Sequence, residues 1–263
     1  MIHIATLHYR DESWIEPQLR YLERHTSEDY RVYACLDGVD HRHFARFHHA
    51  EERGDPIQLE FDYLAALISE EADPDDLLVF MHGDTFPIAD WVGPIRSMLA
   101  ERRLAGIRRD ENLGEPHPHA CFTATTPRLW NEIGADWSRG PMWTGTNGDE
   151  VSDLGATLWR ELEDRGIDWA PILRTNTVDP HPLWFGVYGD IIYHHGAAFR
   201  KPMSRVDASL AAPKRHIYMP LRFIQLERAA WRSSRLSREL YKRLSEDEDF
   251  WMELAAPRSA ARP

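Results

Sequence analysis

The turn His82-Gly83-Asp84 is the segment of this chain whose residue types most clearly suggest chemistry. It follows an apolar run, residues 77–81, that has the composition of a buried strand. A carboxylate in a short turn after such a strand can offer an oxygen ligand to a hard cation such as Mg²⁺ or Mn²⁺. The glycine would let a bulky ligand approach the backbone. The alternative interpretation is an ordinary turn in which Asp84 caps the residues that follow.

The elements before this turn predict how it is positioned. Residues 2–9 alternate as a strand, residues 13–25 have a helical pattern, and residues 30–38 form an apolar run that ends in Asp37. Ser13 and Glu16 have the spacing of a capping box at the start of that helix. The pattern predicts a βαβ unit whose second strand is covered on both faces.

Further strands and helices alternate along the chain. We expect strands at 75–82, 104–110, 119–126 and 184–196, and helices at 57–72, 88–103, 127–134, 149–166 and from 219 to about 255. Residues 40–56, rich in histidine and charge, are predicted as helix or loop. This alternation is typical of one α/β domain with a mostly parallel central sheet, followed by a C-terminal helical extension.

The functional residues of such a sheet usually lie at one edge. Ligands of open α/β sheets bind beyond the carboxyl ends of the strands, where both Asp37 and Asp84 are expected. Two adjacent histidines, His194 and His195, occur in the last strand-like segment. Successive side chains of a strand point to opposite faces, so only one of the two can face that crevice.

Composition limits the classes of partner. A net charge of −12 argues against general binding of nucleic acid, which requires a positive surface. A basic cluster that includes Arg200 and Lys201 can still hold a small anion. The basic helix near the C-terminus suggests weak contact with a membrane surface as a minor alternative to a solvated face. No segment is apolar enough to span a membrane, the start lacks a secretory signal pattern, and Cys35 and Cys121 lie in apolar runs, so we expect a cytoplasmic protein.

The order of these motifs resembles the GT-A fold of nucleotide-sugar glycosyltransferases, family 2-like. In that family an Asp-x-Asp turn follows a central strand, in a form similar to "LDSDAFP", where this chain has "MHGDTFP". The segments "IATLHYRDES" and "ACLDG" are similar to the first two strands of the family. The resemblance covers roughly residues 1 to 200. It implies a nucleotide diphosphate sugar as the donor, with Asp37 near its base or ribose and Asp84 on a divalent metal.

His82 departs from the family pattern. It stands at the first acidic position of the turn, which contacts ribose or metal in the family. Imidazole can bind Mn²⁺ but is a poor ligand for Mg²⁺, so the sequence leaves open which of the two metals is used and whether it is required.

The segment "YHHGAAFR" is similar to the place where the family completes its metal shell with a histidine, followed by basic residues that hold the diphosphate. The resemblance therefore implies His194 or His195 as a metal ligand, with a slight preference for His195. It also implies that Arg200 and Lys201 stabilise the leaving diphosphate.

Acidic residues in "TNGDEVSDLG" supply candidates for a general base. Inverting members of the family place a carboxylate at the start of a helix beneath the acceptor, where it takes the proton of the attacking hydroxyl. Asp153, Glu150 and Asp149 are the candidates, with Asp153 closest to the family position. Acidic residues at a helix start also occur for capping alone, and a retaining enzyme would need no such base.

The sequence thus predicts a metal-assisted glycosyltransferase. Its domain would span residues 1–215, with a nucleotide-binding half to about 110 and an acceptor-binding half from 111, and residues 216–263 would form the extension and tail. One alternative is a nucleotidyltransferase on a related fold, although "HYRDESW" lacks the glycines of a triphosphate loop. The other is a binding protein with a degraded metal site. The nucleotide, sugar and acceptor cannot be read from the sequence.

Overall fold

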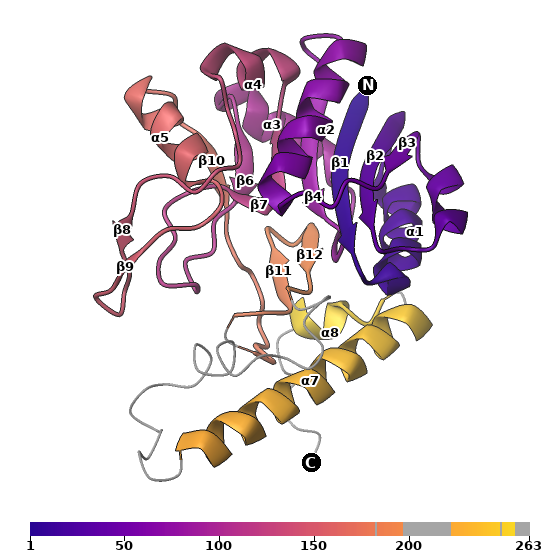
Figure 1. Cartoon of the computed structure of the whole chain (residues 1–263), viewed down its shortest axis with the longest axis vertical. Coiled ribbons are helices and arrows are strands. Elements are labelled where there is room, and N and C mark those ends of the chain that lie inside the picture. Colours follow the sequence, from indigo (N-terminus) through magenta and orange to yellow (C-terminus); the bar gives the residue numbers. More distant parts are fainter. Residues whose placement is uncertain (182, 197–221, 248, 256–263) are drawn as a thin grey trace.

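A seven-stranded sheet forms the centre of the molecule, with strand order β10-β6-β7-β4-β1-β2-β3. The computed structural model describes residues 1–181, 183–196, 222–247 and 249–255 (Figure 1). The strands are β1 (Ile2–Tyr9), β2 (Tyr30–Asp37), β3 (His49–Glu51), β4 (Leu77–His82), β6 (Ala105–Ile107), β7 (His119–Thr125) and β10 (Ala170–Ile172). Only β7 runs antiparallel to its neighbours in this sheet. The predicted α/β class with a mostly parallel sheet is confirmed.

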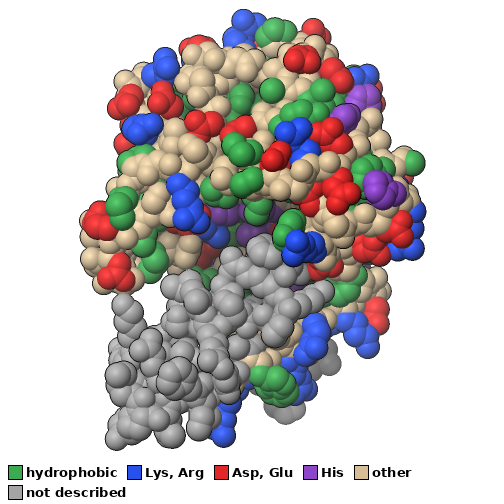
Figure 2. All heavy atoms as spheres, in the orientation of Figure 1, with side chains coloured by type: hydrophobic (Ala, Val, Ile, Leu, Met, Phe, Trp, Pro, Cys, Tyr) green, Lys and Arg blue, Asp and Glu red, His purple; other side chains and the backbone are tan. Residues whose placement is uncertain are grey.

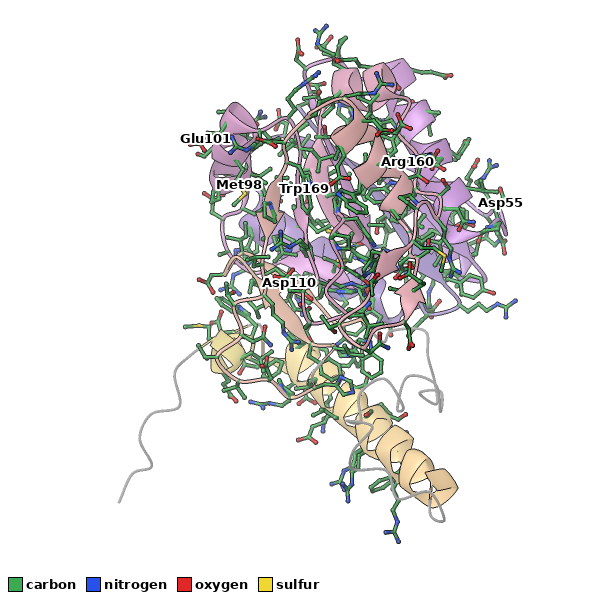
Figure 3. All side chains as sticks on the ribbon, turned by 90° about the vertical axis from the view of Figure 1, so that its left-hand side faces the viewer. Asp55, Met98, Glu101, Asp110, Arg160 and Trp169 are labelled. Carbon is green, nitrogen blue, oxygen red and sulfur yellow. The ribbon has the colours of Figure 1, made fainter. Side chains whose placement is uncertain are left out.

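Helices cover both faces of this sheet, as buried parallel strands require. On one face lie α1 (Ile15–His25) and α3 (Val92–Glu101), packed on side chains such as Ile4 and Val79. On the other lie α2 (Ile57–Glu71), α4 (Pro127–Ile133) and α5 (Ala156–Asp164), packed on side chains such as Phe80 and Tyr33. Figure 3 shows this separation, with Met98 and Glu101 of α3 on one side of the sheet and Arg160 of α5 on the other.

A smaller layer closes the carboxyl end of the sheet. Strands β5 (Thr85–Pro87), β11 (Gly186–Tyr188) and β12 (Ile192–His194) form an antiparallel sheet. Beneath it run α7 (Arg222–Glu246) and α8 (Met252–Ala255) (Figure 1). Their leucines join Trp14, Phe86 and Tyr193 in a third apolar core. This layer places the β12 segment against the turn that follows β4.

Several predicted elements differ in detail. The capping box of Ser13 and Glu16 does not form; Asp11 instead caps a short 3₁₀ helix, Glu12–Trp14, that precedes α1. Residues 41–46 form a second 3₁₀ helix (His41–Arg46), and the predicted strand at 184–196 is the hairpin of β11 and β12. The helical segment from 219 to 255 is divided into α7 and α8. The predicted boundary at 215/216 lies outside the described residues.

The helix predicted at 149–166 begins only at Ala156. Residues 150–151 instead form β9 (Glu150–Val151), which pairs with β8 (Trp143–Thr144) in a small hairpin. Gly155 precedes the helix with φ of 97°, and a side chain there would meet the carbonyl oxygen of Pro118 at 2.4 Å. The acidic residues of the "DEVSD" segment therefore precede the helix rather than lie in its first turn.

Candidate active site

The carboxyl ends of β1, β2 and β4 meet at one edge of the sheet, beside a cavity of about 460 Å³. Its wall includes His82, Asp84, Asp153 and His194, which come from three separate segments of the chain. Figure 2 shows histidine side chains at the floor of a hollow on this face. The structure thus brings several of the predicted site residues to a single cavity at the predicted edge.

The turn after β4 is fixed by close packing against β1. The Gly83 amide donates to the carbonyl oxygen of Leu7 at 3.0 Å. A side chain at Gly83 would stand 2.5 Å from that oxygen and 2.5 Å from Nδ1 of His8, so only glycine fits without a shift of the backbone. Glycine here serves the approach of two strands, in addition to any approach of a ligand.

Gln18 of α1 holds both ends of the same turn. Its Nε2 donates to the carbonyl oxygen of His82 at 2.8 Å and to that of Thr85 at 2.9 Å. Its Oε1 accepts from Thr6 at 3.1 Å and lies 3.0 Å from Nε2 of His8. The side chain is fully buried, and its amide has partners on both sides. A buried amide satisfied in this way fixes the direction of the groups that it binds.

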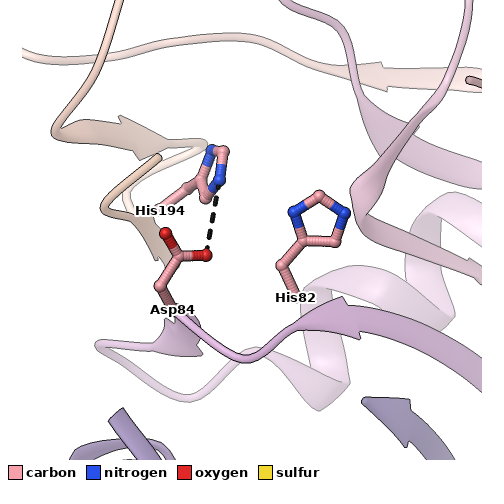
Figure 4. A group of neighbouring side chains, drawn as sticks. All are labelled: His82, Asp84 and His194. Carbon is pink, nitrogen blue, oxygen red and sulfur yellow. Dashed lines mark ion pairs between the residues drawn. The ribbon is translucent and has the colours of Figure 1, made fainter. Parts of the chain in front are cut away.

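His82, Asp84 and His194 form a compact group that can hold a metal ion. Their ligand atoms all lie within 4.8 Å of one another. Nε2 of His194 is 3.7 Å from Oδ1 of Asp84, and Figure 4 shows the two imidazoles and the carboxylate facing a common space. The other carboxylate oxygen of Asp84 accepts from the Gly196 amide at 2.8 Å. The ring of His82 stacks on Phe61 with centroids 5.8 Å apart.

The protonation of these histidines suits metal binding. Burial, and to a lesser degree His194, lowers the pKa of His82 to about 3. Burial, with Arg109 and Arg174, lowers the pKa of His194 to about 3 as well. Both rings are therefore neutral near pH 7, the form in which imidazole is a ligand.

The donor set also fits a cation. Nε2 of His82 is buried and has no hydrogen-bond partner among the described residues. Two imidazole nitrogens and one carboxylate oxygen favour Mn²⁺ or another transition metal over Mg²⁺. A third ring, His119, lies 5.5 Å from His82 between ring centroids, and burial holds its pKa well below the usual value.

The geometry does not support the preference for His195 as the metal ligand, because its ring lies on the opposite side of the strand from Asp84. Nε2 of His195 is 2.8 Å from the Ser237 hydroxyl of α7, and Nδ1 is 2.9 Å from the Tyr193 hydroxyl. The ring also packs on Trp14, with centroids 4.4 Å apart. His194, the other candidate, is the one that faces Asp84 and the cavity.

Of the three candidate bases, Asp153 is the one that lines the cavity. Its Oδ2 accepts from Arg109 at 3.2 Å, and its Oδ1 accepts from the Leu154 amide at 2.9 Å. Arg109 is also held by the buried Glu115, with Nε to Oε2 at 2.8 Å. Although burial acts in the opposite direction, Glu115 and Asp153 raise the pKa of Arg109, which stays charged.

Glu150 and Asp149 lie in the exposed β8–β9 hairpin, so their expected position beside the acceptor is not supported. Glu150 accepts from the Thr144 hydroxyl at 2.6 Å, and Asp149 accepts from the Asn147 side chain at 2.7 Å. The reason is the late start of α5, which leaves both residues in the hairpin before it.

Asp37 turns inward rather than toward the cavity. Its Oδ1 accepts from the amides of Arg53 at 2.8 Å and Gly54 at 3.0 Å, which ties the loop before α2 to the end of β2. Glu60 of α2, which the sequence analysis did not consider, lines the cavity instead. A direct contact of Asp37 with base or ribose is therefore not supported by its position.

Arg200 and Lys201 lie outside the described residues, so their expected role at a diphosphate stays a prediction. Arg109 and Arg139 are the cations that line the cavity in the described part of the chain. Sequence reasoning missed Arg109 because it lies in an irregular loop. It missed Gln18 because a polar residue on an amphipathic helix usually faces water. The available signal was that Gln18 falls on the apolar, buried face of α1.

Comparison with known proteins gives matches at the level of structure alone. No family model matches the chain, and no curated protein matches its sequence. Within the described ranges, no helix has both the length and the apolar character needed to cross a membrane.

Solved structures that match the chain include glycosyltransferases, the family that the sequence resembles. A mannosyltransferase from Pyrobaculum calidifontis, solved with GDP-Man and Mn²⁺, is 13% identical with a TM-score of 0.39, over 51% of this chain and 46% of that one. TarS 1–349 from S. aureus is 9% identical with a TM-score of 0.38, over 52% of this chain and 50% of that one. This chain therefore matches about half the length of those two proteins.

A third match is glucosyl-3-phosphoglycerate synthase from Mycobacterium tuberculosis. It is 12% identical with a TM-score of 0.43, over 66% of this chain and 69% of that one. The likeness concerns the general fold and leaves the question of activity to the residues of the cavity.

Proposed function

We propose that this protein is a metal-assisted glycosyltransferase that moves a sugar from a nucleotide diphosphate sugar to an acceptor hydroxyl. The observation that carries the proposal is the group His82, Asp84 and His194 on the wall of a cavity that also contains Asp153. Such a transfer uses a divalent cation to stabilise the leaving diphosphate and a carboxylate to accept the proton of the acceptor. The cavity offers residues for both roles. The mannosyltransferase among the structural matches, solved with GDP-Man and Mn²⁺, is consistent with this class of reaction.

The donor would bind with its diphosphate toward the metal ligands. A divalent cation held by His82, Asp84 and His194 would supply Lewis-acid stabilisation of the leaving diphosphate. Arg139 offers a further positive charge on the cavity wall, and Arg200 and Lys201 remain candidates for the same role. Gln18 keeps the turn rigid, so the ligand atoms need little rearrangement when the donor binds.

Asp153 would act on the acceptor. Its carboxylate would take the proton of the attacking hydroxyl while that oxygen forms a bond to the anomeric carbon. The bond between this carbon and the phosphate oxygen breaks, and its electron pair remains on the nucleoside diphosphate. Arg109, anchored by Glu115, holds Asp153 in place through the 3.2 Å contact. This role for Asp153 implies inversion at the anomeric carbon.

Calorimetric titration with Mn²⁺, with and without nucleoside diphosphates, tests the metal site. Asp84→Asn should abolish detectable binding of Mn²⁺, because it removes the one anionic ligand of the group. Asp90→Asn is a matched control, because Asp90 is an exposed carboxylate in the loop before α3. Unchanged Mn²⁺ affinity in folded Asp84→Asn would remove the metal site from the proposal.

Turnover of nucleotide sugars tests the base. Asp153→Asn should lower transfer or hydrolysis by about 10²- to 10⁴-fold, the usual contribution of general-base catalysis. Glu150→Gln should retain activity, because Glu150 lies on the exposed hairpin. Equal activity in the two variants would mean that the base is elsewhere or that the reaction retains configuration.

A further inference from the structure

Two buried carboxyl groups meet where β2 and α2 come together. Asp37 is the last residue of β2, and Glu60 lies in the first turn of α2. Each is only 4% exposed. Glu60 also lines the cavity, together with Ile57 and Gln58 of the same helix.

The hydrogen bonds of the pair require a proton between them. Oδ1 of Asp37 already accepts from the amides of Arg53 and Gly54. Oδ2 of Asp37 and Oε1 of Glu60 are both buried with no donor among the described residues. The two side chains are within hydrogen-bonding reach of each other. Two ionised carboxylates cannot satisfy each other, whereas a carboxylic acid and a carboxylate can.

The surroundings place that proton on Glu60. Burial and the Asp37 carboxylate raise the pKa of Glu60 to about 8, although a hydrogen bond from the backbone amide of Asp55 opposes them; the charge of Asp55 raises it further. Burial also opposes ionisation of Asp37, but the hydrogen bonds from Glu60 and from two backbone amides keep its pKa below the usual value. Arg53, the nearby cation, is engaged by Glu51 and Asp55 and lies over the ring of Tyr63.

We infer that Glu60 is an uncharged recognition residue for the nucleoside end of the donor, held in position by Asp37. The inference rests on the proposed function. The metal ligands and Asp153 would take the diphosphate and the acceptor, which leaves the α2 end of the cavity for the nucleoside. There a carboxylic acid can accept a hydrogen bond from an N–H or O–H group of base or ribose while its own proton goes to Asp37.

The uncharged state of Glu60 matters for an anionic ligand. Above about pH 8, ionised Glu60 would stand next to ionised Asp37, and their repulsion would disturb the loop that Asp37 ties to β2. It would also add a negative charge to a cavity that must accept a diphosphate. Asp37 in this scheme is a positioning residue, because it acts through Glu60.

The test is the pH dependence of nucleoside diphosphate affinity, measured by calorimetry with Mn²⁺ between pH 6.5 and 9, for the adenosine, cytidine, guanosine and uridine compounds. The affinity of the wild-type protein should fall by about tenfold between pH 7 and pH 9 as Glu60 loses its proton. Glu60→Gln, which is neutral throughout, should bind within about threefold of wild type at pH 7 and lose the alkaline fall attributed to Glu60. Glu70→Gln, an exposed change on the same helix, should behave as wild type.

Infrared difference spectra separate this inference from the proposed function. At pH 7 the wild-type protein should show the carbonyl stretch of protonated carboxyl groups, and Glu60→Gln should remove part of it. The remainder belongs to Asp62, whose pKa burial raises to about 7. A band that Glu60→Gln leaves unchanged, an affinity that does not change with pH, or an equal alkaline fall in Glu60→Gln would overturn the inference even if nucleotides bind. A band that Glu60→Gln reduces, in a wild-type protein that binds none of the four nucleotides, would overturn both the recognition role and the proposed function, and would leave only the shared proton.

Discussion

The two sides of strand β12 put adjacent histidines to different uses. His194 faces the cavity, where its neighbours are a carboxylate and another neutral imidazole. His195 faces α7, where both ring nitrogens have hydroxyl partners and the ring packs on Trp14. Both side chains are almost fully buried, so burial alone does not distinguish them.

The difference lies in which polar atoms are satisfied. A buried histidine with partners on both nitrogens stabilises the fold, and it has no free nitrogen for an external ligand. His194 instead lies beside two other potential metal ligands, Asp84 and His82, and Nε2 of His82 has no hydrogen-bond partner among the described residues. This arrangement suits the binding of a cation. We therefore expect the cavity side to govern binding and the α7 side to govern stability.

Removing each histidine side chain separately tests this expectation most strongly. His194→Ala should weaken Mn²⁺ binding by more than about 100-fold, because removal of a ligand should exceed the 10- to 100-fold effect of groups that merely orient ligands. His195→Ala should lower the free energy of unfolding by about 3 kcal/mol, since it removes ring packing and two hydrogen bonds. Calorimetry gives the Mn²⁺ affinity of each variant, and denaturant unfolding gives its free energy of unfolding.

The comparison fails if the two variants show the same profile. Ser237→Ala is the control for the α7 side, because it removes one partner of His195 and leaves the ring in place. It should cost about 1 kcal/mol of unfolding free energy and leave Mn²⁺ affinity unchanged.

Replacement of Gln18 should have a smaller effect on Mn²⁺ affinity, because Gln18 supports the turn that carries the ligands without being a ligand itself. Gln18→Leu removes the donors to the carbonyl oxygens of His82 and Thr85, so the turn loses its support from α1. We expect Mn²⁺ affinity to fall by about 10- to 100-fold. Gln18→Glu keeps the size but loses the donors, and should weaken binding in the same direction. Normal metal affinity in both folded variants would show that β1 alone fixes the turn.

Acid should lower the free energy of unfolding through His8, a buried histidine that lines the cavity. Burial lowers the pKa of His8 to about 4, against 6.5 as its ordinary value. The unfolded chain therefore binds more protons between these values, and stability should fall as pH drops from 6.5 to 4, by roughly 3 kcal/mol at most for this group. Unfolding of wild type and His8→Asn across this range should show a shallower slope in the variant; identical slopes would exclude His8 as a contributor.

The central sheet was predictable because its signals are local. The apolar runs at 30–36 and 77–81 are long enough for buried strands, and their carboxyl ends define the edge where ligands bind. The position of Asp84 follows from this rule. The choice between His194 and His195 does not, because it depends on the long-range pairing of β12 with β5, in which His194 lies opposite Thr85.

Other parts of the site depend on contacts that no local pattern reveals. Asp37 turned inward because two amides from the loop before α2 offered it better partners than the cavity. Glu150 and Asp149 moved away from the cavity because Gly155 delayed the start of α5. Arg109 is held by Glu115 in an irregular loop, where neither period 2 nor period 3.6 marks a residue.

The pairing of β5 with β12 also has a consequence for folding. Asp84 accepts hydrogen bonds from the amides of His195 and Gly196, the latter 112 residues along the chain. Closing so long a loop has a large entropic cost before any contact stabilises it, so we expect this junction to form late. The metal ligands would then be complete only in the finished chain. A cation that binds them would recognise the folded state alone, and would shift the unfolding equilibrium in proportion to the logarithm of its concentration.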